Sequence, residues 1–130
     1  MATEFTVILE DKPGRLAGLC GVLGDARVNI EAIQGTSRDG KSRVQFLPRA
    51  PAGAAAALEA AGVPYTVREV VIVKVLGEPG MLGDVALVMA QANISIDSIY
   101  VTTKGHVVLG VDDLDGAIQV AAGMAVMAFE

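Results

Sequence analysis

The apolar and polar positions of this chain follow the same order twice. An apolar strand pattern over Phe5–Glu10 is broken by Pro13-Gly14 and is then followed by an amphipathic helical pattern. The same succession starts at residues 71–76, with the break at Pro79-Gly80. Gly80 lies 66 positions after Gly14, and the alignment needs no gap in this region. The sequence therefore indicates an internal repeat.

The repeat continues beyond the two helical patterns. At the same spacing, "VNIEAI" at residues 28–33 aligns with "ISIDSI" at residues 94–99. Self-similarity at one fixed spacing is typical of a duplicated structural unit. We therefore predict two domains, residues 1–69 and 70–130.

Each predicted helix carries apolar residues at the i, i+3, i+4 and i+7 positions, which lie on one face of a helix. We expect this face to pack on the sheet in both halves. Its members are Leu16, Leu19, Cys20 and Leu23 in the first half, and Leu82, Val85, Ala86 and Met89 in the second.

The remainder of each half predicts a strand hairpin, a second helix and a last strand. Strands over residues 29–37 and 42–47 flank Asp39-Gly40, a preferred pair for a tight hairpin, and the second half has Lys104-Gly105 there. Alanine-rich helices follow, capped at Gly62 and ending at Gly123. The last strands are "YTVREV" and "MAVMAF", residues 65–70 and 124–129.

The order βαββαβ in each half predicts an α+β fold made of two ferredoxin-like units in tandem. In such a unit, both helices cover one face of an antiparallel four-stranded sheet. No Gly, Ser or Pro linker separates "YTVREV" from "VIVKVL", so the two halves are expected to be directly joined.

The predicted first strands are apolar on both faces, which a sheet covered on one side does not require. Ile8 and Ile72 interrupt the expected alternation with polar residues. Because large exposed apolar patches are rare on monomers, we expect the other half or a second copy of the chain to cover this face. A homodimer is the prediction.

Composition and charge exclude several classes of function. The chain has 130 residues, and 10 Lys and Arg against 15 Asp and Glu give a net charge of -5, so nucleic acid is not an expected partner. No apolar run suggests a membrane segment or leader peptide. The single cysteine excludes an internal disulfide and favours the cytoplasm. No motif predicts a cofactor.

The Pro-Gly turn offers a place for a small zwitterion. A helix that follows a short turn begins with unpaired N–H groups and the positive end of its dipole, which attract a carboxylate. Gly14 permits close approach, Asp11 can accept bonds from an ammonium group, and the amide of Asn29 can both donate and accept. These groups together suit an α-amino acid.

The stretch "EDKPGRLAGLCGVLGDARVNIEAI" resembles the ACT domain, an amino-acid-binding regulatory module, and the whole chain resembles two of them. The resemblance implies that paired modules bind an effector through Asp11, Gly14, Asn29 and the backbone of Ile30. The second half departs from the pattern, with Gly77 in place of Asp11 and Ser95 in place of Asn29. Its residues Gly80 and Ser95 are expected to serve only as a partner surface.

Each of these residues also has a purely structural interpretation. Asp11 can cap a turn, and Asn29 can bond its own loop backbone. We interpret three further glycines, spaced three apart in the first helix, as close packing against the sheet rather than as a phosphate loop. They are Gly18, Gly21 and Gly24.

No catalytic or metal site can be assembled from the titratable residues. Cys20 is predicted to be a buried structural thiol, and His106 an exposed strand residue with no nucleophile near it. Three acids precede the last helix and are explained by N-capping rather than by a metal ion. They are Asp112, Asp113 and Asp115.

The sequence thus predicts a small stand-alone regulatory protein and not an enzyme. It would bind a free amino acid at the junction between modules and pass occupancy to a partner, such as a metabolic enzyme. The alternative is an interaction module without ligand, or a detached regulatory subunit of an amino-acid biosynthetic enzyme. A small ferredoxin-like enzyme is a third possibility.

Overall fold

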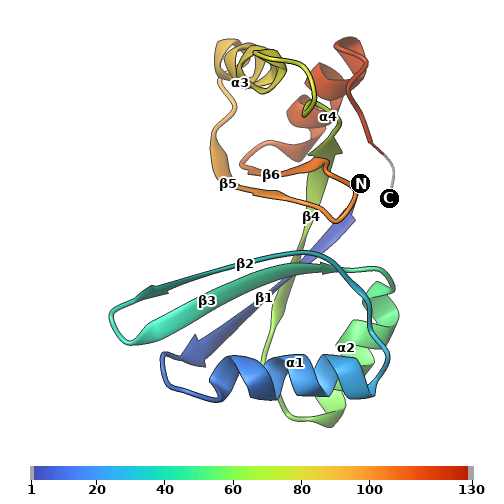
Figure 1. Ribbon diagram of the computed structural model, residues 1–130. Coiled ribbons are helices and arrows are strands. Elements are labelled where there is room, and N and C mark those ends of the chain that lie inside the picture. The colour runs from blue at the N-terminus through green and yellow to red at the C-terminus, as the bar shows by residue number, and fades with distance from the viewer. Residues whose placement is uncertain (1, 129–130) are drawn as a thin grey trace. The chain divides into compact units, whose positions relative to one another are not determined.

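The computed structural model describes residues 2–128 and divides into two compact units. We call residues 3–68 the N-terminal unit, and residues 69–128 with Ala2 the C-terminal unit. Each unit is α+β, with strands and two helices (Figure 1). The predicted fold class of ferredoxin-like units is confirmed.

In the N-terminal unit, the strands lie in the order β2-β3-β1-β4, and β3 pairs antiparallel with both β1 and β2. The elements are β1 (Ala2–Glu10), α1 (Arg15–Asp25), β2 (Ile30–Arg38), β3 (Lys41–Pro48), α2 (Pro51–Ala60) and β4 (Thr66–Val73).

In the C-terminal unit, the strands lie in the order β4-β6-β5, and β6 pairs antiparallel with both neighbours. The further elements are α3 (Met81–Gln91), β5 (Ile96–Val101), β6 (Val107–Val111) and α4 (Leu114–Gly123). The order of elements repeats that of the N-terminal unit.

Strand β4 replaces two predicted strands with one. The strands predicted at residues 65–70 and 71–76 are continuous over Thr66–Val73, and the boundary between the units falls within β4 at Glu69. The predicted end at Leu76 is wrong, because the strand ends at Val73, and the last pairing along it is the bond from Lys74 N to Val126 O at 2.7 Å, next to the bridge between Val73 and Met127.

The last predicted strand, residues 124–129, is reduced to an isolated bridge. Met127 bridges Val73 in antiparallel orientation, and Ala128 N donates to Ile72 O at 2.9 Å. Phe129, the end of that predicted strand, lies outside the described residues.

Each unit buries one sheet face beneath its two helices. In the N-terminal unit, Phe5 stacks on Phe46 and on Tyr65, with ring centroids 5.5 and 5.3 Å apart. Leu19, Leu23, Ala54 and Leu58 close this core from the helix side. The core of the C-terminal unit contains mainly valine, with Val85 and Met89 from α3. Among residues 2–128, none of the helices has the length and apolar character that a membrane crossing requires.

The predicted inner face of α1 is only half right. Leu19 and Leu23 are buried, but Leu16 is 53% exposed and Cys20 is exposed, so the buried structural thiol is a wrong prediction. For Cys20, the reason is rotation about the helix axis, because Val22 packs against the core and turns the buried stripe away from Cys20. Leu16 lies on the same side of the helix as Leu23, but it borders the open cavity and is therefore exposed. In α3, the predicted face is confirmed, with Val85 and Met89 buried and Leu82 packed against them.

The three helical glycines of α1 do not pack against the sheet. Gly18, Gly21 and Gly24 are exposed, and a Cβ atom added to any of them would meet nothing within 4 Å. The predicted close packing is therefore wrong, because the rotation of α1 places these residues on its outer side.

The two hairpins have different turns. Asp39 (φ 53°) and Gly40 (φ 78°) are both left-handed, as a two-residue type I′ turn requires, and the predicted tight hairpin is confirmed. In the second hairpin, only Gly105 has positive φ, at 78°, and Gly105 N donates to Thr102 O. This loop is therefore longer than the predicted Lys104-Gly105 pair.

At equivalent positions, the two units agree more closely in backbone conformation than in side chains. Gly14 and Gly80 precede α1 and α3 with φ of 89° and 85°, and Arg27 and Asn93 follow these helices with φ of 57° and 60°. After α2, Gly62 takes the left-handed position as predicted. Helix α4 ends at Gly123, as predicted, but Ala125 is the residue with positive φ after it.

The apolar positions on the second face of the sheet have different environments. Ile72 is 3% exposed, whereas Ile8 is 56% exposed. Ile8 therefore leaves a large apolar side chain in solvent, and the predicted homodimer stays a prediction.

Replacing Gly21 by alanine should stabilise the N-terminal unit by about 0.5–1 kcal/mol, because an exposed helical glycine costs backbone entropy and has space for a methyl group. Gly14→Ala is the matched control and should destabilise, because the backbone at Gly14 is left-handed. Urea unfolding followed by circular dichroism measures both shifts. A lower midpoint for Gly21→Ala would contradict the exposed position.

Candidate functional site

Helix α1 begins without a capping side chain. Gly14 is its N-cap in a left-handed conformation, no side-chain hydrogen bond caps it, and its first turn contains no acidic residue. The first helical bond runs from Gly18 N to Gly14 O at 2.9 Å. The positive end of the helix dipole is therefore open to an anion.

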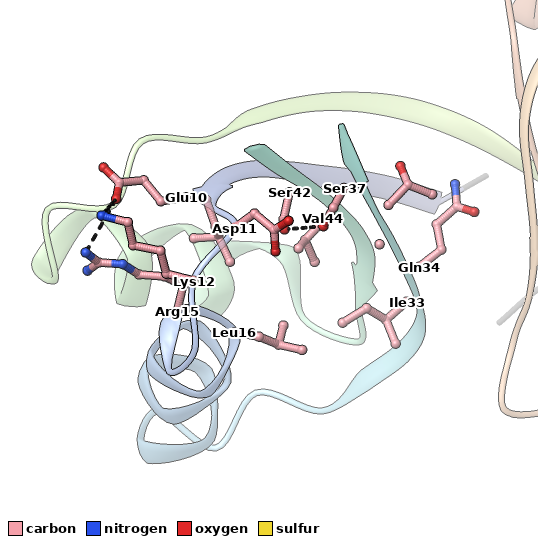
Figure 2. Close-up of a pocket in the computed structure, with 13 residues that line it drawn as sticks. Glu10, Asp11, Lys12, Arg15, Leu16, Ile33, Gln34, Ser37, Ser42 and Val44 are labelled. Carbon is pink, nitrogen blue, oxygen red and sulfur yellow. Dashed lines mark hydrogen bonds and ion pairs between the residues drawn. The ribbon is translucent and has the colours of Figure 1, made fainter. Parts of the chain in front are cut away.

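Two cations flank this helix start. Lys12 Nζ lies 3.1 Å and Arg15 Nη2 lies 3.6 Å from Glu10 Oε2 (Figure 2). All three side chains are about half exposed or more, and such surface ion pairs contribute at most about 1 kcal/mol each. A bound carboxylate can therefore replace Glu10 as the partner of Lys12 and Arg15 with little loss of free energy.

A cavity of about 460 Å³ opens beside the start of α1, between this helix and the β2–β3 hairpin. This volume lies in the range of small-molecule sites. Leu16 of α1 and Ile33 of β2 point into the space between helix and sheet (Figure 2). The lining residues are Leu9, Glu10, Asp11, Lys12, Arg15, Leu16, Ile33, Gln34, Gly35, Thr36, Ser37, Ser42 and Val44.

The cavity has an apolar part and a polar part. Leu9, Leu16, Ile33 and Val44 form the apolar part. The hydroxyl oxygens of Ser37 and Ser42 lie 2.7 Å apart on neighbouring strands, and either can donate. A hydroxyl can rotate to donate or to accept, so this pair can adapt to a polar group on a ligand.

The hairpin tip is attached to the turn that precedes α1. Asp11 N donates to Gly40 O at 2.9 Å. Asp11 itself is exposed and lines the cavity. This bond therefore holds the tip of the β2–β3 hairpin next to Asp11, at the edge of the cavity.

The structure does not bring all the predicted ligand residues together. Asp11 and Gly14 lie at the start of α1, but Asn29 and Ile30 follow its end, about 16 Å away along an eleven-residue helix (Figure 1). Asn29 is exposed, and its carbonyl accepts from Arg49 N at 2.8 Å. Ile30 packs against the core. One unit therefore cannot present Asp11 and Asn29 to the same small molecule.

The predicted residues of the second half have a different setting. Gly80 begins α3 as Gly14 begins α1. Ser95 N donates to Asp112 Oδ1 at 2.9 Å, and Asp112 N donates to Ser95 O at 3.2 Å. The backbone of Ser95 is thus already bonded, and only its exposed side chain faces outward.

The start of α3 lacks the charges that surround the start of α1. At the spacing of the repeat, Glu78 takes the place of Lys12, and Met81 takes the place of Arg15. Asp84 lies in the first turn of α3 and compensates the dipole. The same backbone is therefore attractive to an anion only in the N-terminal unit.

The other chemical candidates remain structural. Asp113 caps α4, with Oδ1 accepting from Gly116 N at 3.0 Å, so the N-capping interpretation is confirmed for Asp113, whereas Asp112 accepts from Ser95 N and Asp115 lies in the first turn of α4. Within residues 2–128, no group of three His, Cys, Asp or Glu could hold a metal ion. His106 is partly buried and precedes β6, so its prediction as an exposed strand residue is wrong.

Sequence reasoning missed most residues that line the cavity. The contrast of Lys12 and Arg15 with Glu78 and Met81 was visible in the aligned repeat and signals a charge difference between the two turns. The positions of Ser37 and Ser42 depend on hairpin register, in which they pair directly. Leu16 and Ile33 carry no sequence signal for a site, because both fit a buried pattern.

Comparison with protein families identifies the N-terminal unit. The family model for the ACT domain matches residues 3–61. An ACT domain is therefore found there, and the resemblance seen in the sequence is confirmed for this half. The match does not extend into the C-terminal unit, so a tandem of two ACT domains stays a prediction. No curated protein sequence matches the chain.

Solved structures with the same fold span most of the chain. Protein BT0572 from Bacteroides thetaiotaomicron has a TM-score of 0.88 at 22% identity, over 97% of this chain and 90% of that one. The regulatory subunit of aspartate kinase from Thermus thermophilus has a TM-score of 0.71 at 16% identity, over 95% and 91%. The same subunit from Thermus flavus gives 0.64 at 16% identity, over 94% and 90%. At these identities, the likeness shows the fold.

Truncating Leu16 should change the stability of the chain very little, because its side chain lies in the open cavity and not in the core. Leu16→Ala should shift the free energy of unfolding by about 0.5 kcal/mol or less. Leu19→Ala, less than one turn away, should cost about 2–5 kcal/mol. Urea unfolding of both variants measures the difference, and equal losses would show that Leu16 is a core residue.

Proposed function

We propose that the N-terminal unit binds a free amino acid in the cavity beside α1 and that the chain acts as a regulatory module. The observation that carries this proposal is the open start of α1, flanked by Lys12 and Arg15, next to a cavity with an apolar wall. The matched ACT domain, an amino-acid-binding module by resemblance, supports it. So do the regulatory subunits of aspartate kinase that share the fold.

In this proposal, the ligand carboxylate lies at the first N–H groups of α1, near the cations of Lys12 and Arg15. Gly14 leaves room for it, because no Cβ projects there. The carboxylate of Asp11 accepts from the ligand ammonium group. An aliphatic side chain then packs on Leu16 and Ile33, where burial of apolar surface adds to the affinity.

Asn29 and Ile30 enter the proposal through a second module. Because they lie at the far end of α1, they can touch a ligand only if a second copy of the chain contributes them to the cavity. Binding would then favour the paired arrangement, since a ligand shifts an equilibrium by its difference in affinity for the two states. Gly80 and Ser95 remain the proposed partner surface, and Ser95 can act only through its side chain.

The charge distribution distinguishes the two units. Residues 3–68 contain eight Lys and Arg against seven Asp and Glu, a net charge of +1, and residues 69–130 contain two against eight, a net charge of -6. An anionic group is thus attracted to the N-terminal unit and repelled by the C-terminal unit. This asymmetry favours one kind of working site per chain.

Isothermal titration of the purified protein against each of the twenty amino acids tests the proposal. We expect heat from one or a few aliphatic or hydroxylated amino acids. Arg15→Gln should then weaken binding by about tenfold to a hundredfold, because a hydrogen bond to a charged group contributes about 1.5–3 kcal/mol.

Glu78→Gln is the matched control, because Glu78 occupies the position of Lys12 in the second half. It should leave the affinity unchanged. Absence of heat with all amino acids would refute the proposed ligand, and equal effects of Arg15→Gln and Glu78→Gln would refute the proposed location.

A further inference from the structure

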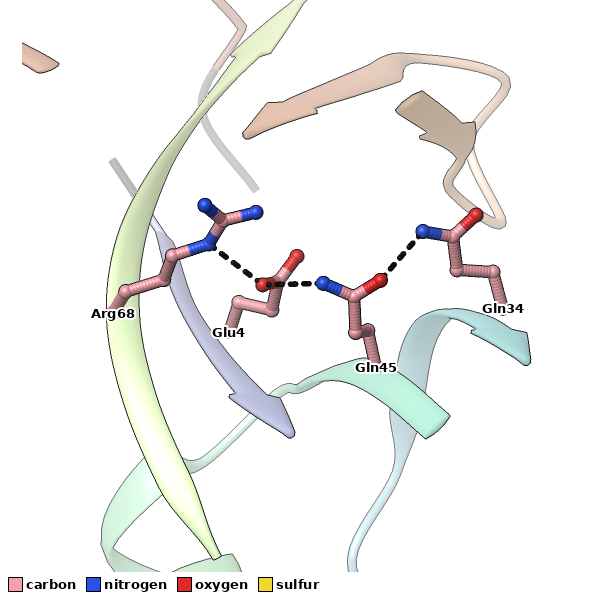
Figure 3. Close-up of polar contacts among 4 residues, drawn as sticks. All are labelled: Glu4, Gln34, Gln45 and Arg68. Carbon is pink, nitrogen blue, oxygen red and sulfur yellow. Dashed lines mark hydrogen bonds and ion pairs between the residues drawn. The ribbon is translucent and has the colours of Figure 1, made fainter. Parts of the chain in front are cut away.

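A chain of polar side chains crosses the sheet of the N-terminal unit, with one residue from each strand. Gln34 Nε2 of β2 donates to Gln45 Oε1 of β3 at 2.7 Å, and Gln45 Nε2 donates to Glu4 Oε1 of β1 at 3.2 Å. Arg68 Nε of β4 donates to the same Glu4 oxygen at 2.8 Å (Figure 3). We call these four residues the polar chain.

The polar chain lies on the sheet face opposite the helices. Gln34 and Gln45 are paired in register, next to Ile33 and Phe46, and Phe46 belongs to the core beneath the helices. Because successive side chains of a strand point to opposite faces, Gln34 and Gln45 point away from the helices. Ile33 and Gln34 lie on opposite sides of β2 (Figure 2).

The bonds of the polar chain have one possible direction. The carboxylate of Glu4 can only accept, so Gln45 must turn its amide nitrogen toward Glu4 and its oxygen toward Gln34. Gln34 must then donate. Arg68, which carries a fixed positive charge, sets this order from the other end. An amide flip at any point would place two acceptors or two donors together.

Burial makes the polar chain sensitive to a missing partner. Glu4 is fully buried, Gln45 is 6% exposed, and the side chain of Arg68 is 33% exposed. A buried carboxylate that loses one of its donors costs more than the bond itself contributes, because water cannot replace the donor. The four strands are therefore held in one relative arrangement.

The two ends of the polar chain lie at functionally different places. Gln34 is flanked by Ile33 and Gly35, which line the cavity beside α1. Arg68 lies on β4 and is followed by Glu69, where the C-terminal unit begins. Three hydrogen bonds thus connect the edge strand β2, which lines the cavity, to β4, which continues past Arg68 into the C-terminal unit.

We propose that Glu4, Gln45 and Arg68 are positioning residues that hold β2 in place as the floor of the cavity and link its occupancy to β4. None of the three lines the cavity. The part that concerns occupancy rests on the proposed amino-acid binding. The part that concerns the position of β2 does not, and it can be measured on the protein alone.

The test uses one substitution that breaks a hydrogen bond of the polar chain and a second substitution that restores the bond. Gln45→Glu replaces the donor facing Glu4 by a second carboxylate and breaks the polar chain in the middle. Adding Glu4→Gln in the same protein supplies all three bonds again once the amide at position 4 turns its nitrogen toward the carboxylate at position 45, to which it donates, and its oxygen toward Arg68, from which it accepts. Arg43→Gln, an exposed position on the same strand, is the matched control.

Hydrogen exchange of the peptide covering residues 33–37, followed by mass spectrometry, is the readout. Gln45→Glu should speed exchange by about tenfold or more relative to α3, and the double variant should return to the wild-type rate. Arg43→Gln should have no effect. Wild-type exchange in Gln45→Glu, or no recovery in the double variant, would overturn the proposal.

If Gln45→Glu does not fold, Gln34→Leu provides a second test of the positioning role. It removes the last link and leaves the buried pair of Glu4 and Arg68 intact, so the protein should fold and residues 33–37 should again exchange faster. Unchanged exchange in this variant would also overturn the proposal.

The second arm adds each of the twenty amino acids in turn. A bound amino acid should slow exchange at residues 33–37 and 66–69 in the wild type and in the double variant, but only at residues 33–37 in Gln45→Glu, because Gln45 does not line the cavity. Slowing at residues 66–69 in Gln45→Glu as well would overturn the link to β4. If no amino acid changes exchange while Gln45→Glu does, the amino-acid proposal fails and the positioning role stands.

Discussion

The left-handed backbone at Gly14 is the constraint on which the site depends. It allows the chain to pass from β1 into α1 through a short turn in which Arg15 N donates to Lys12 O at 3.3 Å and no side chain caps the N–H groups that follow. Near the same turn, Lys12 and Arg15 both pair with Glu10, and Asp11 N donates to Gly40 O of the hairpin. The attraction of this helix start for an anion follows from this conformation.

The two halves have the same backbone conformation at this turn but different charges around it. Gly80 begins α3 with nearly the same φ as Gly14, and the residues that follow each helix also agree. The side chains around the second turn, however, are Glu78, Met81 and Asp84, which satisfy or oppose the positive helix end. The two units thus share the backbone of this turn and differ in the charge of the side chains around it.

Much of the N-terminal unit was predictable because local rules determine it. The hairpin at Asp39-Gly40, the start of α1 after Pro13-Gly14 and the left-handed position of Gly62 all follow from the intrinsic preferences of glycine and of its neighbours. The ACT resemblance rests on the same local features. They fix where elements begin and end, and for this reason the order of elements emerged correctly.

The rotation of α1, the strand register and the long-range polar contacts were decided only by the tertiary structure. An apolar stripe through Leu19, Cys20 and Leu23 satisfies helix periodicity as well as one through Leu19, Val22 and Leu23, and only packing on the sheet selects the second. Ser37 meets Ser42, and Glu4 meets Arg68, through pairings that no local pattern encodes. The sequence by itself determined the elements, their duplication and the open helix end. The tertiary structure determined which side chains surround that end, because this depends on segments that are distant along the chain and adjacent only after folding.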